Sequence, residues 1–89
     1  MQRQLTSSEV ADRLRHLAAE QTNLQPNEVT LESHLQNDLS FDSLDHIDYA
    51  AAVEEEYDIR IPEGQVQDLR NVGQVLDAVM RILRGPVHA

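Results

Sequence analysis

The 89-residue chain contains no cysteine and no lysine, and it has only three glycines and three prolines. Without cysteine, a disulfide framework, a CxxC site and a thiol nucleophile are all excluded. No apolar run is long enough to span a membrane or to form the core of a signal peptide. We therefore expect a soluble, cytoplasmic protein that does not insert into membranes, and a hydrophobic content of 40% indicates a globular fold.

Positive charge is scarce as well. Acidic residues number 16 against seven basic residues, all arginine, and the net charge is −9. Residues 38–58 include no arginine or lysine, and their acidic residues are Asp38, Asp42, Asp45, Asp48, Glu54, Glu55, Glu56 and Asp58. This field repels nucleic-acid phosphates and anionic lipid, and it attracts basic protein surfaces. We predict a basic protein partner and no nucleic acid.

The spacing of apolar residues predicts three longer helices. The first begins after Thr6, whose spacing to Glu9 is that of a capping box, and it ends near residues 21–23. The second covers about Ser43–Tyr57, and the last follows Asn71 and stops at Gly85–Pro86. Their predicted core positions are Val10, Leu14, Leu17 and Ala18, then His46, Tyr49, Ala50, Val53 and Tyr57, then Val72, Val75, Leu76, Val79 and Leu83.

The connections complete the expected fold. Residues 23–41 are too many for a structureless loop in a compact domain, so we expect an ordered loop with a helical turn near Ser33–Gln36. Its anchors are Leu24, Val29, Leu31, Leu35 and Leu39. Residues 63–69 form a short third helix. The prediction is an all-α, small antiparallel four-helix bundle in a single domain, residues 1–89, with a core at about 7–84 and flexible ends at 1–5 and 85–89.

The stretch "NDLSFDSLDHID", residues 37–48, places a serine at the start of the second helix. If Asp42 is the N-cap, Asp45 lies three residues on and completes a D-x-x-D variant of the capping box. Ser43 is then exposed at the first helical position, where unpaired N–H groups and the helix dipole favour an anion. The alternative is that Ser43 is itself the cap, which spacing alone favours.

The face of the second helix opposite the core stripe is mixed in character. Three apolar residues project there together, interleaved with acidic ones and flanked by two more. They are Leu44, Ile47 and Ala51, with Asp48 and Glu55 between them and Asp45 and Glu54 at the sides. Scattered surface apolar residues are normal. An apolar centre with a rim of one charge, beside an exposed serine, nevertheless predicts a docking surface for a basic, partly hydrophobic partner.

The run "SHLQNDLSFDSLDHIDYAAAVEEEYDIRIP" resembles the acyl carrier protein family, with its D-L-x-x-D-S-L-D core, Glu run and I-x-I-P ending, and "NVGQVLDAV" fits the later V-x-x-V pattern. The resemblance covers about residues 8–83. It implies a non-catalytic carrier in which a transferase moves 4′-phosphopantetheine from coenzyme A onto Ser43, between Asp42 and Leu44. The thiol of that arm carries acyl groups as thioesters, which accounts for a carrier without cysteine.

The same resemblance implies the partners. The helix bearing Asp45, Ile47, Asp48, Ala51, Glu54 and Glu55 would be read by basic surfaces of the phosphopantetheinyl transferase, acyltransferases, ketosynthases or acyl-ligases. These enzymes belong to fatty-acid, polyketide or related acyl biosynthesis, and we expect the carrier to be a monomer. Ser40 and Phe41 stand where a small Gly–Ala-like pair is common, and Tyr49 stands where leucine is frequent. These departures favour a dedicated carrier over the housekeeping fatty-acid one.

Two aromatic side chains and one histidine have open roles. Phe41 either packs against His46 as a hydrophobic staple, which we favour, or contacts a partner. The hydroxyl of Tyr49 must find a hydrogen-bond partner or reach solvent. For His46 we favour a boundary position with a satisfied hydrogen bond, and the alternative is a pH-sensing side chain at the mouth of an acyl-binding cavity.

Other functions fit the residues less well. An enzyme with Ser43 as nucleophile and His46 as base lacks an orienting group and an oxyanion motif. An EF-hand fails because Ser43 replaces the glycine at loop position 6 and Tyr49 the glutamate at position 12. The histidines His16, His34 and His88 show no metal-ligand spacing, and we predict no metal site. A peptidyl carrier and an acidic helical adaptor without the prosthetic group remain alternatives.

Overall fold

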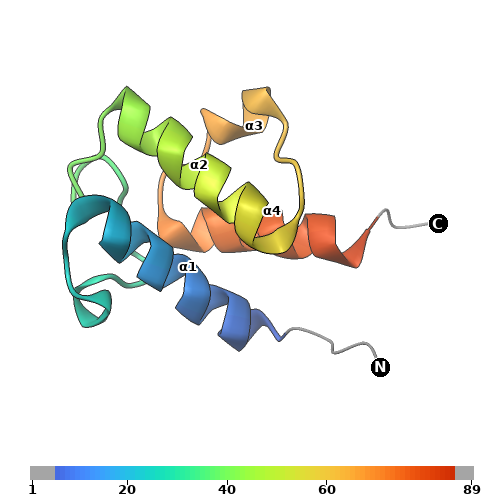
Figure 1. The fold of residues 1–89 in the computed structure, drawn as a ribbon, viewed down its shortest axis with the longest axis horizontal. Coiled ribbons are helices and arrows are strands. Elements are labelled where there is room, and N and C mark those ends of the chain that lie inside the picture. The colour runs from blue at the N-terminus through green and yellow to red at the C-terminus, as the bar shows by residue number, and fades with distance from the viewer. Residues whose placement is uncertain (1–5, 86–89) are drawn as a thin grey trace.

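The computed structural model describes residues 6–85, which are helical with ordered connections (Figure 1). The elements are α1 (Ser7–Thr22), the short 3₁₀ helix η1 (Pro26–Glu28), α2 (Ser43–Tyr57), α3 (Glu63–Val66) and α4 (Val72–Arg84). No helix in this part of the chain is long and apolar enough to cross a membrane. The predicted all-α bundle of three longer helices and one short helix is confirmed.

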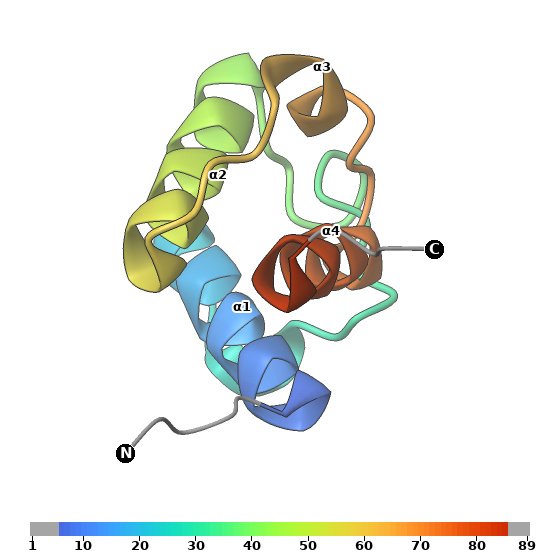
Figure 2. The same cartoon turned by 90° about the vertical axis from the view of Figure 1, so that its right-hand side faces the viewer.

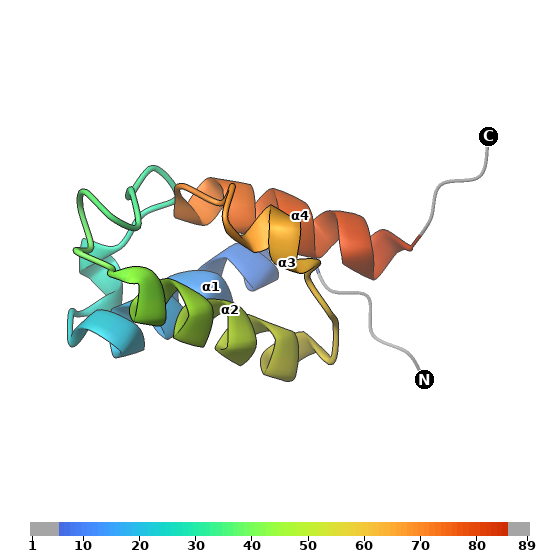
Figure 3. The same ribbon diagram turned by 90° about the horizontal axis from the view of Figure 1, so that it is seen from above.

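The three long helices surround the core, and α1 runs antiparallel to both α2 and α4 (Figures 1 and 2). The short α3 lies between α2 and α4, on the side of the bundle away from α1 (Figures 2 and 3). The predicted ends 1–5, and residues 86–89 of the predicted C-terminal end, lie outside the described residues. Among the helices of residues 6–85, none covers one face of α2 (Figures 2 and 3).

Each long helix begins at the residue that its capping signal predicts. The Thr6 hydroxyl accepts the Glu9 N–H at 3.1 Å, and the Glu9 carboxylate accepts the Thr6 N–H at 3.0 Å. Asn71 caps α4 by accepting the Gln74 N–H at 2.8 Å. These side chains satisfy N–H groups that have no partner inside the helix, which fixes where the helices start.

The predicted core stripes of α1 and α2 are largely buried. All four predicted positions of α1 are buried, and so are Tyr49, Ala50 and Val53 of α2, whereas His46 and Tyr57 are half-buried. In α4 the prediction for Leu83 is wrong, since its side chain is 36% exposed. Ala78 is buried instead, so the buried stripe of α4 includes Ala78 and not Leu83.

The long loop between α1 and α2 is ordered and packed, as predicted, and Val29, Leu35 and Leu39 are buried. The helical turn that we predicted near Ser33–Gln36 is present at residues 34–38, where the Asp38 N–H donates to the His34 carbonyl at 2.9 Å. The loop also contains η1, because Pro26 presets its backbone and the Glu28 carboxylate accepts the Gln25 N–H at 2.8 Å.

Residues 33–35 also pair with the segment that leads into α4. His34 forms an isolated antiparallel bridge with Asn71, and the Leu35 N–H donates to the Arg70 carbonyl at 2.8 Å. Nearer α1, the Arg15 guanidinium donates to the Val29 carbonyl at 2.8 Å and to the Pro26 carbonyl at 3.2 Å. Contacts to two helices therefore hold the loop, and the loop sets the point at which α2 begins.

Candidate functional site

The first turn of α2 is closed by a reciprocal pair of aspartates. The Asp42 carboxylate accepts the Asp45 N–H at 2.8 Å, and the Asp45 carboxylate accepts the Asp42 N–H at 3.1 Å. Ser43 is the first helical residue and is exposed. The alternative in which Ser43 caps the helix is therefore wrong, and its hydroxyl is left accessible.

The carboxylate of Asp45 is held in its charged form. Hydrogen bonds from the Asp42 N–H and from the Gln21 side-chain amide, the latter at 3.1 Å, lower the pKa of Asp45. Within residues 6–85 the backbone N–H groups of Ser43 and Leu44 donate no hydrogen bond. These two donors and the positive end of the helix dipole favour an anion on the serine oxygen.

The segment just before α2 adopts an unusual backbone. Ser40 has φ of 60°, a left-handed conformation that glycine adopts more easily than serine. Phe41 is 4% exposed, and its ring packs edge-on against Tyr49 with centroids 5.5 Å apart. A buried ring is unavailable to a partner, so the partner-contact alternative for Phe41 is wrong.

The mixed face of α2 is open to solvent. Leu44 is 70% exposed and Ile47 is 59% exposed, and Ala51, Asp48 and Glu55 are exposed around them. Large apolar side chains at this exposure contribute little to folding. Leu44 and Ile47 therefore form an exposed apolar patch that does not belong to the core.

Two of the flanking acids accept hydrogen bonds from backbone N–H groups of the protein itself. Asp45 and Glu54 are both partly buried. Asp45 belongs to the capping box, and the Glu54 carboxylate accepts the Ile61 N–H at 2.7 Å. Asp48 and Glu55 make no such bond among the described residues, so they are the cleaner candidates for partner recognition.

A cavity of about 340 Å³ opens beside the serine, between α2 and α3. Its lining residues are Ser43, His46 and Ile47 from α2, Glu63 and Val66 from α3, and Gln67. Sequence reasoning missed the contribution of α3, since a four-residue helix leaves no periodic signal. The cavity adjoins a groove of about 320 Å³ that shares Ile47, Glu63 and Val66 and extends to Arg60.

His46 has the hydrogen bond that we expected, since its Nε2 lies 2.8 Å from the Val66 carbonyl oxygen. A carbonyl oxygen can only accept, so Nε2 carries the hydrogen. The residue also lines the cavity with Ser43. His46 therefore has both features that were considered for it: a satisfied hydrogen bond at the edge of the core and a place in the lining of a cavity.

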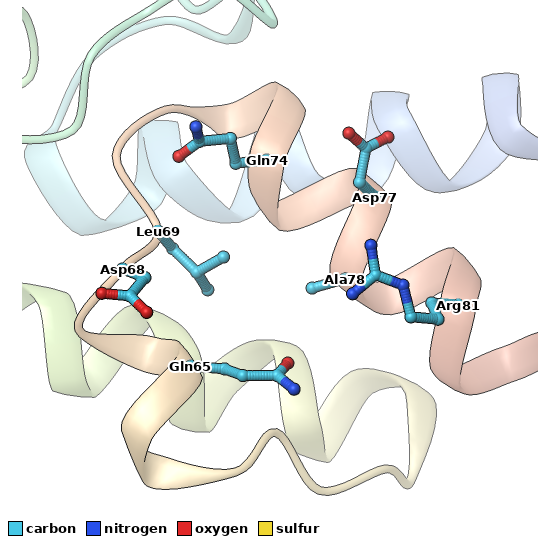
Figure 4. A pocket seen from close by; sticks show the side chains of 7 residues that line it. All are labelled: Gln65, Asp68, Leu69, Gln74, Asp77, Ala78 and Arg81. Atoms are coloured by element: carbon cyan, nitrogen blue, oxygen red, sulfur yellow. The ribbon is translucent and has the colours of Figure 1, made fainter.

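Another hollow, of about 310 Å³, lies between α3 and α4 and does not include the serine (Figure 4). Figure 4 shows that polar groups of both charges line it. The lining residues are Gln65, Asp68, Leu69, Gln74, Asp77, Ala78 and Arg81. Among the described residues, no group of three or more His, Cys, Asp or Glu side chains could hold a metal ion.

Residues 12–79 match the family described as the phosphopantetheine attachment site. An acyl carrier protein of Porphyromonas gingivalis is 34% identical over 77 residues, covering 86% of this chain and 99% of the relative. One from Amoebophilus asiaticus is 39% identical over 70 residues, covering 79% of this chain and 88% of the relative. One from Thermosynechococcus vestitus is 32% identical over 75 residues, covering 84% and 93%. The chain belongs to the acyl carrier protein family.

Membership makes covalently attached 4′-phosphopantetheine the cofactor. The residues of this acyl carrier protein fit the group. The Ser43 hydroxyl is accessible, the N–H groups of Ser43 and Leu44 are free to face a phosphate, and the carboxylates of Asp42 and Asp45 are turned to each other's backbone. The resemblance inferred from the DSLD core is confirmed at the level of the family.

Proposed function

We propose that this protein carries acyl intermediates on a 4′-phosphopantetheine arm attached to Ser43. The observation that supports this proposal is the reciprocal capping of Asp42 and Asp45, which relieves the serine of capping and leaves its hydroxyl exposed at the first helical position. The arm supplies a terminal thiol that holds acyl groups as thioesters. The protein itself presents the serine, stabilises the phosphate and is not a catalyst.

The mixed face of α2 is the proposed docking surface. Its exposed apolar centre, Leu44, Ile47 and Ala51, meets the apolar part of a partner, and Asp48 and Glu55 attract the basic rim. Asp45 and Glu54 lie at the edges of this surface and add to its charge. The proposed partners are the phosphopantetheinyl transferase and acyltransferases, ketosynthases or acyl-ligases of fatty-acid, polyketide or related acyl biosynthesis.

The remaining expectations belong to the same proposal. We propose that residues 1–89 form a single carrier domain that works as a cytoplasmic monomer. A transient carrier gains from a small, accessible surface, because each enzyme must release it after transfer. Sedimentation of the purified chain tests the monomer directly.

Intact-mass spectrometry tests the site of attachment. The protein is incubated with coenzyme A and a broad-specificity phosphopantetheinyl transferase, and we expect the mass of one phosphopantetheine to be added. Ser43→Ala should add none, whereas the nearby exposed Ser40, changed to glycine to suit its backbone, should leave modification intact. Modification of the folded Ser43→Ala variant would contradict the assignment.

The same experiment separates the alternatives. A modified protein that accepts amino-acid thioesters, and not fatty acyl thioesters, would identify a peptidyl carrier. A folded protein that several transferases fail to modify would favour an acidic adaptor that uses the carrier fold without the arm.

A further inference from the structure

His46 lies one helical turn beyond Ser43, and both side chains line the same cavity. Side chains on a helix lean toward its N-terminus, so the imidazole lies over the turn that begins with Ser43. Its Nε2–H donates to the Val66 carbonyl of α3. Its Nδ1 has no hydrogen-bond partner among the described residues. The ring therefore has one nitrogen fixed on α3 and one nitrogen available.

The charges around this ring are negative. Asp42 and Asp45 belong to the same turn of α2, and Glu63 faces the cavity from α3. Residues 38–58 include no arginine or lysine, and Arg60 lines the adjoining groove but not the cavity at Ser43. A phosphodiester on Ser43 adds one more negative charge. His46 is the group in this cavity that can acquire a compensating positive charge.

We propose that His46 is a positioning residue for the phosphodiester on Ser43, an inference that rests on the proposed function. The imidazole takes up a proton from solvent at Nδ1 and donates that N–H to a phosphate oxygen, while Nε2–H stays on the Val66 carbonyl. No covalent bond forms or breaks. The protonated ring then links the root of the arm to α3 and holds it at the cavity mouth, and deprotonation removes this link.

Phosphorus NMR of the modified protein tests the hydrogen bond between His46 and the phosphodiester on Ser43. A phosphodiester keeps one negative charge throughout the neutral range, so its ³¹P shift changes with pH only if a neighbouring group titrates. We expect an inflection between about pH 5 and pH 8, the range in which histidine changes charge. Carboxyl groups ordinarily titrate near pH 4, below this range, so an inflection within it reports an imidazole.

The matched variants are His46→Gln and His16→Gln, both modified by the transferase before measurement. His16 lies on α1, where its Nδ1 is 2.8 Å from the Asp12 carbonyl, and it does not line the cavity. The inflection should be lost in His46→Gln and unchanged in His16→Gln. Glutamine keeps a donor that can reach Val66, so circular dichroism and the backbone spectrum of α3 should change little.

Two results would overturn the proposal. The first is a ³¹P shift of the wild-type protein that stays flat above pH 5, and the second is an inflection that persists in His46→Gln. Both are read from protein whose intact mass shows the added arm, so they leave the attachment at Ser43 in place. Failure of the modification itself would count against the proposed function instead.

Discussion

The phenol hydroxyl of Tyr49 donates a hydrogen bond to the backbone carbonyl of Leu14, over 3.0 Å in the buried core. This bond joins α2 to α1, at a position where Tyr49 is 2% exposed and also supports the ring of Phe41. The tyrosine that departs from the leucine frequent in the family therefore finds the partner its hydroxyl needs. It helps to fix α2, and with it the face that carries Ser43.

Changing Tyr49 to phenylalanine should remove this bond while keeping the ring. We expect a loss of about 1 kcal/mol in the free energy of unfolding, the usual net value of one buried hydrogen bond. Urea unfolding followed by circular dichroism measures it, with Tyr57→Phe as a control at a half-buried ring. An equal loss in both variants would contradict a specific role for the bond to Leu14.

The stability of the protein should fall in alkaline solution, and Tyr49 should contribute to the fall. Burial raises the pKa of Tyr49, so the folded state keeps the phenol protonated to a higher pH than the unfolded chain does. The contribution is complete below about pH 10, where the unfolded phenol is protonated, and it declines above that pH.

The slope is at most about 1.4 kcal/mol per pH unit for one proton. Burial also raises the pKa of Tyr57, with a further contribution from Glu56, so part of the decline should remain when Tyr49 is absent. Unfolding between pH 9 and pH 11 should show a shallower decline in Tyr49→Phe than in the wild-type protein. Identical slopes in the two proteins would refute the role of Tyr49.

The cap of α2 can be tested separately from the serine. Asp42→Ala removes the acceptor for the Asp45 N–H and should lower the free energy of unfolding by about 1 kcal/mol. Asp42→Asn keeps an acceptor and should cost only a few tenths of that energy. Urea unfolding of both variants measures the difference, and equal stabilities would show that the capping box contributes nothing at this end of the helix.

Much of this fold could be predicted because its signals are local. Thr6, Asp42 and Asn71 are capping residues whose side chains act within three positions, so the sequence around each one is sufficient. The exposed face of α2 followed from helical periodicity alone. In each case the cause and the effect lie within a few residues of each other.

The errors and omissions involve contacts between distant segments. The bridge from His34 to Asn71 was not predicted, because it depends on where α4 starts. The exposure of Leu83 depends on how α4 is rotated against its neighbours. The bond from His46 to Val66 spans 20 positions and ends on a backbone carbonyl, which every residue has. No side-chain pattern could have indicated it.

The second half of α2 is rich in acidic residues, and only some of them have partners within the protein. Its last turn includes no basic residue, and its C-cap is Asp58, an arrangement that the helix dipole disfavours. Glu54 and Glu56 have structural partners in the Ile61 N–H and the Arg13 guanidinium, the latter at 3.1 Å. Asp48 and Glu55 have no such partner among the described residues, so their charge is available to a partner protein.

Reversing both charges, Asp48→Lys with Glu55→Lys, should slow modification by a basic transferase at least about tenfold at low salt, because steering between opposite charges speeds encounter. The control is Asp68→Lys with Asp77→Lys, which makes the same change in net charge at one exposed position just after α3 and one on α4. Transfer rates should fall much less in the control, and added salt should narrow the gap. Equal slowing in the two variants, with native circular dichroism, would mean that net charge matters and that this face of α2 is not the docking surface.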